Sequence, residues 1–308
     1  MDIAFVTEMM LSGKIPRNFL DMRVPLSWIC SLEADHIHYT LVPDKMYDVI
    51  IVILPKKNLE EWIKLDVLNK LKSFCKKLAI MQEGPHWYFQ DYKVSTQFWF
   101  YNALTSTDIL LVHNNSDAIY YEGLLNHPNI KIMPSLMLED IIEVSNEERN
   151  GVMIGGNFCY WYGGFDSYIV AQEAGCSIYA PSMGRKQEEE EQIPDITHLP
   201  YINWKNWIYE LSKRKYGIHL MRTQAAGTFA LNCAYLGIPC IGYKGLDTQE
   251  ICHPDLTIEV GFLSKAKILL NKLKDKSFYK ECADKSKRLY KECYTEKNYK
   301  EWLSTILS

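Results

Sequence analysis

The chain has 308 residues, of which 47% are hydrophobic and 23% charged, and its formal net charge is −4. This composition is that of a globular protein and excludes disordered and fibrous classes. Its apolar runs are shorter than the ~18 to 20 residues that a membrane-spanning helix needs, and its first residues lack the order of a signal peptide. We therefore expect a cytoplasmic protein with no integral membrane segment.

The first half alternates strands and helices. Strands alternate with helices long enough to cross back over a sheet, which predicts a parallel sheet with crossover connections. The expected strands are 2–8, 47–55, 78–84, 107–114 and 130–135, and the expected helices are 25–32 and 59–77.

The alternation restarts after a polar stretch, "EVSNEERNG", that ends at residue 151. We therefore expect an N-terminal domain over 1–150 and a second domain over 151–308. The sequence predicts the α/β class, with two Rossmann-like doubly wound domains facing across a cleft. Further elements are expected at 151–157, 167–175, 176–182, 206–214 and 216–221.

The segment 219–243, "HLMRTQAAGTFALNCAYLGIPCIGY", predicts a strand, a helix and a second strand. Gly227 and Thr228 fit a helix start, where the hydroxyl can accept an unpaired amide, and Gly237 fits a helix end. Unpaired amides and the positive end of the helix dipole favour an anion, and Arg222 comes just before them. Either a phosphate site or an ordinary crossover fits this pattern.

Other candidates for the same ligand also follow expected strands of the second domain. Glycines let a backbone approach a ligand closely, and cations neutralise phosphate. Neither G-x-G-x-x-G after the first strand nor G-x-x-x-x-G-K-[ST] occurs, so dehydrogenases and P-loop enzymes lose support. The candidates are Gly155, Gly156 and Asn157 after one strand, and Arg185 and Lys186 after another.

The segment 222–239 resembles the donor-site motif of glycosyltransferases with the GT-B fold. In that family two glutamates eight positions apart precede an A-x-A-x-G-x-P ending, which here reads "CAYLGIP". The two positions fall on Gln224 and Asn232, so this chain has amides where the family has carboxylates. The resemblance implies that Gln224 contacts a donor sugar and Asn232 the ribose hydroxyls, through uncharged hydrogen bonds.

The resemblance implies a nucleotide-diphosphate sugar as co-substrate, with a UDP-sugar as the expected donor and no other cofactor. "GGNFCYWYGGFDSY" and "MQEGPHWYFQDY" look like segments of uncharacterised transferases of bacteria and bacteriophages. No D-x-D motif occurs, and the cysteines show no zinc spacing, so we expect no metal. His36 and His38 share one strand face without a third ligand, which we interpret as structural.

The acceptor side falls to the first domain. Gly13 resembles the flexible loop through which such enzymes admit an acceptor. Glu83 directly follows a buried strand and precedes Gly84-Pro85, with His86 and Asp91 close behind. If transfer inverts the anomeric centre, Glu83, His86 or Asp91 is the expected general base, with Glu83 preferred. If transfer retains the configuration, these side chains only position the acceptor.

The acceptor and the oligomeric state stay open, and the acceptor is a glycan, a small molecule or modified DNA. A phage-type transferase acting on hydroxymethylated bases is one alternative, because residues 264–308 carry 12 basic against 6 acidic side chains. A helix around Lys70, Lys72, Lys76 and Lys77 would add a phosphate-tracking stripe. A catalytically silent nucleotide- or sugar-binding protein is the other alternative, suggested by Gln224 and Asn232.

Overall fold

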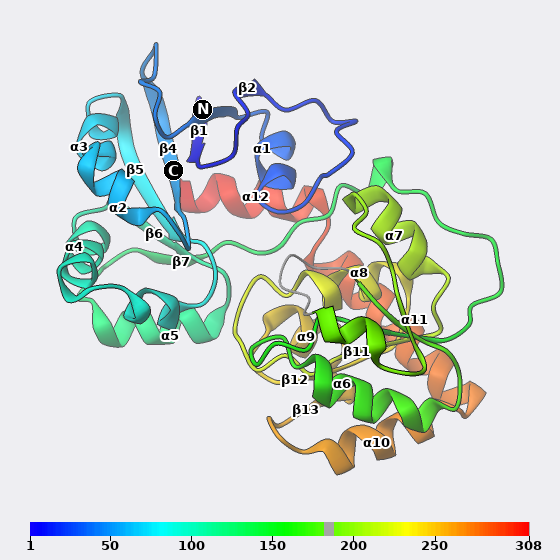
Figure 1. Cartoon of the computed structure of the whole chain (residues 1–308). Coiled ribbons are helices and arrows are strands. Elements are labelled where there is room, and N and C mark those ends of the chain that lie inside the picture. Colours follow the sequence, from blue (N-terminus) through cyan, green and yellow to red (C-terminus); the bar gives the residue numbers. More distant parts are fainter. Residues whose placement is uncertain (182–187, 308) are drawn as a thin grey trace. The chain divides into compact units, whose positions relative to one another are not determined.

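The computed structural model describes residues 1–181 and 188–307 and divides the chain into two compact units (Figure 1). The first unit comprises residues 1–19, 23–136 and 299–308, and the second comprises 20–22 and 137–298. Each unit is a sheet covered by helices. Within the described ranges no helix is long and apolar enough to cross a membrane.

The first unit contains a seven-stranded sheet in the order β2-β3-β1-β4-β5-β6-β7. All neighbouring strands are parallel except the antiparallel pair β2 and β3. The strands are β1 (Ile3–Thr7), β2 (Gly13–Lys14), β3 (Asp35–His38), β4 (Tyr47–Leu54), β5 (Cys75–Gln82), β6 (Ile109–Val112) and β7 (Ile130–Ile132).

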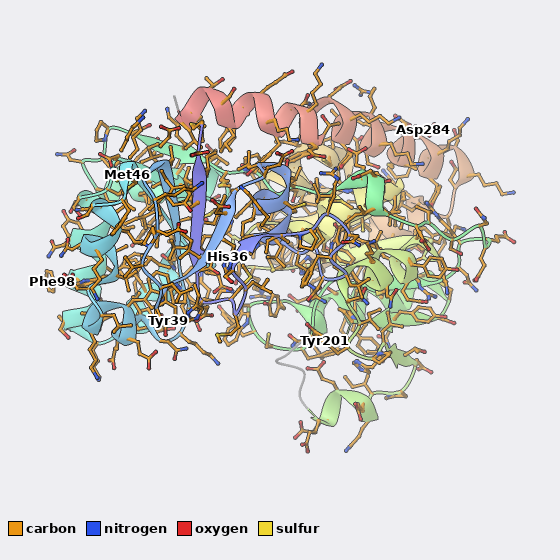
Figure 2. All side chains as sticks on the ribbon, turned by 90° about the horizontal axis from the view of Figure 1, so that it is seen from above. His36, Tyr39, Met46, Phe98, Tyr201 and Asp284 are labelled. Atoms are coloured by element: carbon orange, nitrogen blue, oxygen red, sulfur yellow. The ribbon has the colours of Figure 1, made fainter. Side chains whose placement is uncertain are left out.

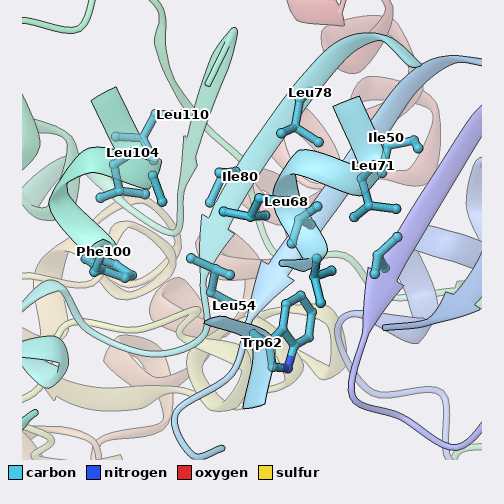
Figure 3. Packing of buried hydrophobic residues seen from close by; sticks show 14 of the residues in the cluster. Ile50, Leu54, Trp62, Leu68, Leu71, Leu78, Ile80, Phe100, Leu104 and Leu110 are labelled. Atoms are coloured by element: carbon cyan, nitrogen blue, oxygen red, sulfur yellow. The ribbon is translucent and has the colours of Figure 1, made fainter. Parts of the chain in front are cut away.

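The central strands are apolar on both faces, as parallel strands between two helical layers must be. In β4, Ile50, Val52 and Leu54 belong to a core cluster with Trp62 and other helical side chains (Figure 3). The alternate residue Ile51 is also fully buried but lies outside that cluster. The helices of this unit are α1 (Leu26–Ser31), α2 (Leu59–Lys64), α3 (Val67–Lys72), α4 (Val94–Thr105), α5 (Asn115–Leu124) and α12 (Glu296–Leu307), with the short 3-10 helix η1 (His86–Asp91) before α4.

The single helix expected over 59–77 is wrong. The chain forms α2 and α3, separated at Asp66, whose φ of 52° is left-handed, and then enters β5 at Cys75. A left-handed residue cannot continue a right-handed helix, so the helical spacing of apolar residues is met by two short helices.

This correction removes the expected lysine stripe on one helix. Lys70 and Lys72 lie on α3, whereas Lys76 and Lys77 lie on β5. Lys76 Nζ is 2.7 Å from the Asp48 carboxylate, and Lys77 donates to a backbone carbonyl at the end of α12. The observation that favoured DNA as a partner in the first domain is therefore absent.

The helices α4 and α5 were not anticipated. α4 carries apolar residues on all sides, so it lacks the one-sided pattern of a surface helix, and Phe98 on its outer face is 66% exposed (Figure 2). α5 begins with a clear cap, because the Asn114 side chain accepts the Asp117 amide at 2.9 Å.

The second unit contains a six-stranded sheet in the order β10-β9-β8-β11-β12-β13, and all neighbouring strands are parallel. Its strands are β8 (Val152–Ile154), β9 (Ile178–Ala180), β10 (Ile196–His198), β11 (Tyr216–His219), β12 (Cys240–Tyr243) and β13 (Thr257–Ile258). Its helices are α6 (Gly164–Ala171), α7 (Trp204–Ser212), α8 (Thr228–Leu236), α9 (Asp247–Cys252), α10 (Leu263–Lys272) and α11 (Lys276–Cys293), and its 3-10 helices are η2 (Glu139–Ile141), η3 (Gln172–Ala174), η4 (Glu188–Gln192) and η5 (Pro254–Leu256).

The predicted strand–helix–strand unit is confirmed as β11, α8 and β12, with the two strands paired in parallel. Gly227 and Gly237 flank α8 in the left-handed conformation, with φ of 68° and 66°. The start differs in one detail, because Gly227 is the N-cap and no side chain caps the helix, so the Thr228 hydroxyl does not accept an amide there.

The compact units do not coincide with the expected division at residue 150. Residues 137–150 lie with the second unit, where the Tyr290 hydroxyl of α11 donates to Glu139 at 3.0 Å. The last ten residues lie with the first unit, where the Leu307 carbonyl accepts from Lys77 at 3.2 Å. Both attachments depend on contacts between distant segments, which local sequence pattern does not encode.

Candidate functional site

The carboxyl end of the second sheet gathers most of the predicted donor residues. Arg222 follows β11, and its Nη2 lies 2.9 Å from Oδ2 of Asp166 in the first turn of α6. The Tyr243 hydroxyl, at the end of β12, donates to the same oxygen at 3.2 Å. The carboxylate of Asp166 is the main cause of the raised pKa of Arg222. Asp166 thus holds the guanidinium in place.

Arg222 keeps capacity for a ligand despite this ion pair. A guanidinium has five N–H donors in a planar fork, and the structure assigns one Nη2 contact to Asp166. The Arg222 side chain is 41% exposed. Its remaining donors therefore suit a phosphate or carboxylate. The predicted cations Arg185 and Lys186 lie outside the described residues.

The start of α8 lies shortly after Arg222 in the chain. The first amides of a helix have no acceptor within the helix, and no described residue accepts from those at the start of α8, so this end presents donors to a ligand. Gly227 is required there, because an added Cβ would lie 2.1 Å from the Thr248 hydroxyl oxygen, which donates to the Gly227 carbonyl. Thr228 is exposed at the first helical position.

The two amides at the family's glutamate positions occupy different surroundings. Asn232 is 3% exposed, one turn beyond Thr228 on the same face of α8, and a helical side chain leans toward the helix start. Among the described residues, none forms a hydrogen bond with the Asn232 amide. Gln224 is half-buried, and its Nε2 lies beside Gly245 after β12. Both amides therefore sit in segments that border the sheet edge.

The predicted glycines after β8 serve internal packing. An added Cβ at Gly155 would lie 2.4 Å from the His219 ring, and one at Gly156 would lie 2.8 Å from the Cβ of Tyr162. Asn157 is fully buried, and its Oδ1 accepts from the Cys159 thiol at 2.8 Å. These three residues shape the loop between β8 and α6 and present no side chain at the surface.

His219, at the end of β11, was missed by the sequence analysis. It is 7% exposed, and burial lowers its pKa from 6.5 to about 4. It packs edge-on against Phe229 of α8 with ring centroids 5.2 Å apart. A neutral histidine at this position braces both the loop at Gly155 and the first turn of α8.

The carboxyl end of the first sheet carries the predicted acceptor residues. Glu83 follows β5, and its Oε1 is 3.3 Å from Nζ of Lys56, which follows β4. Lys56 passes over Gly84, where an added Cβ would lie 2.5 Å from the lysine side chain. Glu8 follows β1, and its pKa is raised first by burial and second by the charge of Glu83. Two carboxylates therefore share this edge.

His86 is held at this edge by contacts with two side chains of α5. Its Nδ1 lies 2.7 Å from Oδ1 of Asp117, and its ring stacks on Tyr120 with centroids 4.0 Å apart. Asp117 is itself held, because its Oδ2 accepts from Asn114 at 3.1 Å. Nε2 of His86 has no hydrogen-bond partner among the described residues. A base oriented by a carboxylate is the arrangement that accepts protons in many enzymes.

The other predicted residues of the first unit lie apart from His86 and its partners. Asp91 is exposed at the end of η1. Gly13 lies in the edge strand β2 opposite His36, with a φ of 76° and no atom within 4 Å of an added Cβ. The ring of His36 bonds to the Thr7 hydroxyl and to a backbone carbonyl, in agreement with a structural role. Within the described ranges no cluster of three or more His, Cys, Asp or Glu side chains is arranged to hold a metal ion.

Three residues of these edges had signals that the sequence analysis did not use. Glu8 is the last residue of the first expected strand, Asp166 is an acid in a first helical turn, and Asp117 comes three residues after a helix cap. Their partners are distant in the chain, since Asp117 is 31 residues from His86 and Asp166 is 56 residues from Arg222. Position at a sheet edge was visible, but the pairing was not.

No protein-family model matches the sequence. No curated protein matches it either. Solved structures do resemble it, at sequence identities near 10%.

The sucrose-phosphate synthase of Thermosynechococcus elongatus matches with a TM-score of 0.74 and 10% identity, over 99% of this chain and 98% of that one. Anabaena Alr3699/HepE, solved in complex with UDP and glucose, matches with a TM-score of 0.71 and 9% identity, over 100% and 99%. TarM matches with a TM-score of 0.67 and 9% identity, over 87% of this chain, and the chain spans 56% of the length of TarM. The chain therefore has the GT-B fold with two Rossmann-like domains, as its sequence predicts.

Proposed function

We propose that the chain is a glycosyltransferase that moves a sugar from a nucleotide-diphosphate sugar to an acceptor hydroxyl, with a UDP-sugar as the donor. The observation that carries this proposal is the edge formed by β11, α8 and β12. It combines the held guanidinium of Arg222, the unpaired amides at the start of α8, and Asn232 one turn further. These groups suit a diphosphate followed by a ribose.

The similar structures support the choice of donor. Anabaena Alr3699/HepE was solved with UDP and glucose, and the pneumococcal O-GlcNAc transferase GtfA with UDP and GlcNAc. GtfA matches with a TM-score of 0.65 and 11% identity. A UDP-sugar is accordingly the first donor to test. The proposed acceptor is a hydroxyl of a glycan or small molecule.

For transfer with inversion, we propose His86 as the general base. The acceptor oxygen forms a bond to the anomeric carbon, the bond from that carbon to the diphosphate oxygen breaks, and the acceptor proton moves to Nε2 of His86. Asp117 stabilises the resulting imidazolium through Nδ1. Glu83 is the weaker candidate, because its carboxylate is already paired with Lys56.

Matched substitutions test this assignment. His86→Gln keeps a polar side chain but removes the base, so we expect donor affinity to stay normal and single-turnover transfer, or donor hydrolysis, to fall by about a hundredfold or more. Glu83→Gln should change the rate by less than about tenfold. A large loss in Glu83→Gln with a normal rate in His86→Gln would reverse the two roles, and normal rates in both would support retention of configuration.

A catalytically silent nucleotide-sugar-binding protein is the second candidate. The uncharged Gln224 and Asn232 favour it, since they replace two carboxylates of the resembling family. Release of nucleotide from a nucleotide sugar separates the two, because a silent protein binds the donor without turnover.

A further inference from the structure

The second unit has a cavity away from the donor edge. It has a volume of about 480 Å³ and lies where β8, β9 and β11 begin, lined by Gly151, Cys176 and Lys215 just before these strands. The strands are parallel, so this is the amino-terminal edge of the sheet, whereas Arg222 and the start of α8 lie at the carboxyl-terminal edge. A ligand in this cavity would not occupy the donor site.

Three cations line the cavity, and two of them, Arg149 and Lys274, donate hydrogen bonds to uncharged backbone groups. Arg149 donates to the carbonyls of Leu236 and Gly237 at the end of α8, at 2.6 and 2.9 Å. Lys274 donates to the backbone carbonyl of Glu173 at 2.7 Å.

Lys215 is the third cation. Its ammonium nitrogen lies 5.2 Å from the ring centroid of Tyr216 and 5.9 Å from that of Tyr279. Within the described residues no carboxylate forms an ion pair with Arg149, Lys215 or Lys274. The acid Glu148 also lines the cavity and is exposed, so the lining carries two more positive than negative charges.

We propose that this cavity binds a small phosphorylated anion. Cations in a concave site with low-dielectric walls concentrate anions, and lysine and arginine are the side chains that hold phosphate oxygens. The volume lies within the range of about 300 to 1,000 Å³ typical of small-molecule sites. Binding here is independent of glycosyl transfer, so the proposal goes beyond the proposed function.

Cys176 provides a local reporter of occupancy. Its thiol lines the cavity, and Lys215 and Lys274 are both close enough to act on its charge, although burial is the larger effect and raises its pKa. An anion bound between the two lysines would cover the thiol. Cys293 is exposed on α11 and lies outside the cavity lining, so it serves as an internal control.

The test measures iodoacetamide alkylation of Cys176 by mass spectrometry in the full chain, with inorganic phosphate, a hexose 6-phosphate, or sodium chloride at matched ionic strength. With a phosphate compound at ten times its Kd, we expect alkylation of Cys176 to slow by about tenfold, because only about a tenth of the sites are empty. Alkylation of Cys293 should not change. Tighter protection by the sugar phosphate than by phosphate would identify a metabolite as the ligand, and equal protection would identify free phosphate.

Charge removal supplies the second arm. Lys215→Gln with Lys274→Gln should raise the concentration needed for protection by about tenfold or more for each lysine. The control variant combines Lys272→Gln with Lys276→Gln, at two exposed positions that do not line the cavity. In this variant the phosphate compound should protect Cys176 as it does in the wild type. Lys274→Gln alone, at an exposed position, covers the case in which the double variant does not fold. Absence of protection in the wild type, or equal protection in the wild type and Lys274→Gln, would overturn the proposal.

Discussion

At the scale of single residues, Arg222 is the side chain whose role the structure defines most closely. Arg222 and Tyr243 both donate to one carboxylate oxygen of Asp166, which holds the guanidinium at the end of β11. We expect Arg222→Ala to weaken binding of UDP by about ten- to a hundredfold, because one charge-assisted contact contributes about 1.5 to 3 kcal/mol. Calorimetric titration with UDP measures this.

Arg288 offers the matched control for Arg222. It also pairs with a carboxylate, Glu292, but on the solvent face of α11. Arg288→Ala should bind UDP as the wild type does. Equal affinities in both variants would remove Arg222 from the donor site.

Asn232 and Gln224 predict a division of labour. Asn232 is buried on α8 without a hydrogen-bond partner in the described part of the chain, so Asn232→Ala should weaken binding of UDP itself by about fivefold or more, the effect of one lost neutral hydrogen bond. Gln224→Ala should spare UDP and reduce discrimination among UDP-sugars. Titrations with UDP and then with UDP-sugars measure the two effects. If both substitutions changed both ligands equally, the correspondence with the family's two glutamates would be wrong.

At the scale of elements, α6 is placed by glycines. Gly163, the N-cap of α6, has a φ of 63°, and an added Cβ would lie 1.9 Å from the carbonyl oxygen of Leu220 just after β11. This contact lets α6 approach β11 closely enough for Asp166 to reach Arg222. Gly175 has a similar φ of 68° but open space around it.

These two glycines separate steric clash from backbone strain. We expect Gly175→Ala to lower the free energy of unfolding by about 1 kcal/mol, and Gly163→Ala by about 3 kcal/mol or more. Denaturant unfolding of both variants measures the difference. Similar losses would mean that the loop after β11 can move aside, and that α6 is not held by this contact.

Helix α8 is also fastened by a buried histidine. His253 is 2% exposed, and its Nε2 donates to the Ala230 carbonyl at 3.0 Å. Burial lowers its pKa from 6.5 to about 4. Between these pH values His253 is therefore neutral in the folded protein and protonated in the unfolded chain. Stability should therefore fall as the pH drops from about 6.5 to about 4, by about 2 kcal/mol at pH 5 for this one group.

His253→Gln tests the sign and the source of this effect. The glutamine amide can still donate to Ala230 but does not titrate, so the variant should lose less stability between pH 7 and pH 5 than the wild type. Thermal unfolding at both pH values measures this. A pH dependence identical to that of the wild type would exclude His253 as a source of acid instability.

Elements were predictable from sequence where the signal was local. The apolar run of β4 and the glycines flanking α8 indicated their structures directly. A strand buried on both faces requires consecutive apolar residues, and a left-handed helix end favours glycine. The break at Asp66 and the strand β10 had no comparable signal in the residue types of their segments. In the sites, sheet-edge positions were predictable, whereas the ion pairs of Arg222 and Glu83 depend on side chains from other elements.

At the scale of the whole molecule, the GT-B fold is retained at sequence identities near 10%. In the sequence, the fold is indicated by the alternation of strands and helices in both halves and by the spacing of small residues around α8. The membership of α12 depends on a contact between distant segments, since α12 follows α11 in the sequence but its Leu307 carbonyl accepts from Lys77 of β5.

The central claim is that the molecule turns over a nucleotide-diphosphate sugar. Its most direct test is the release of nucleotide over time from a panel of nucleotide sugars built on UDP, GDP, ADP and dTDP, with the wild type and His86→Gln compared at equal donor saturation. We predict that the wild type releases UDP from at least one UDP-sugar, and that His86→Gln releases it about a hundredfold more slowly while binding the same donor. Binding of a donor with no release of nucleotide by the wild type, for every sugar in the panel, would contradict this claim and leave a binding protein with the GT-B fold.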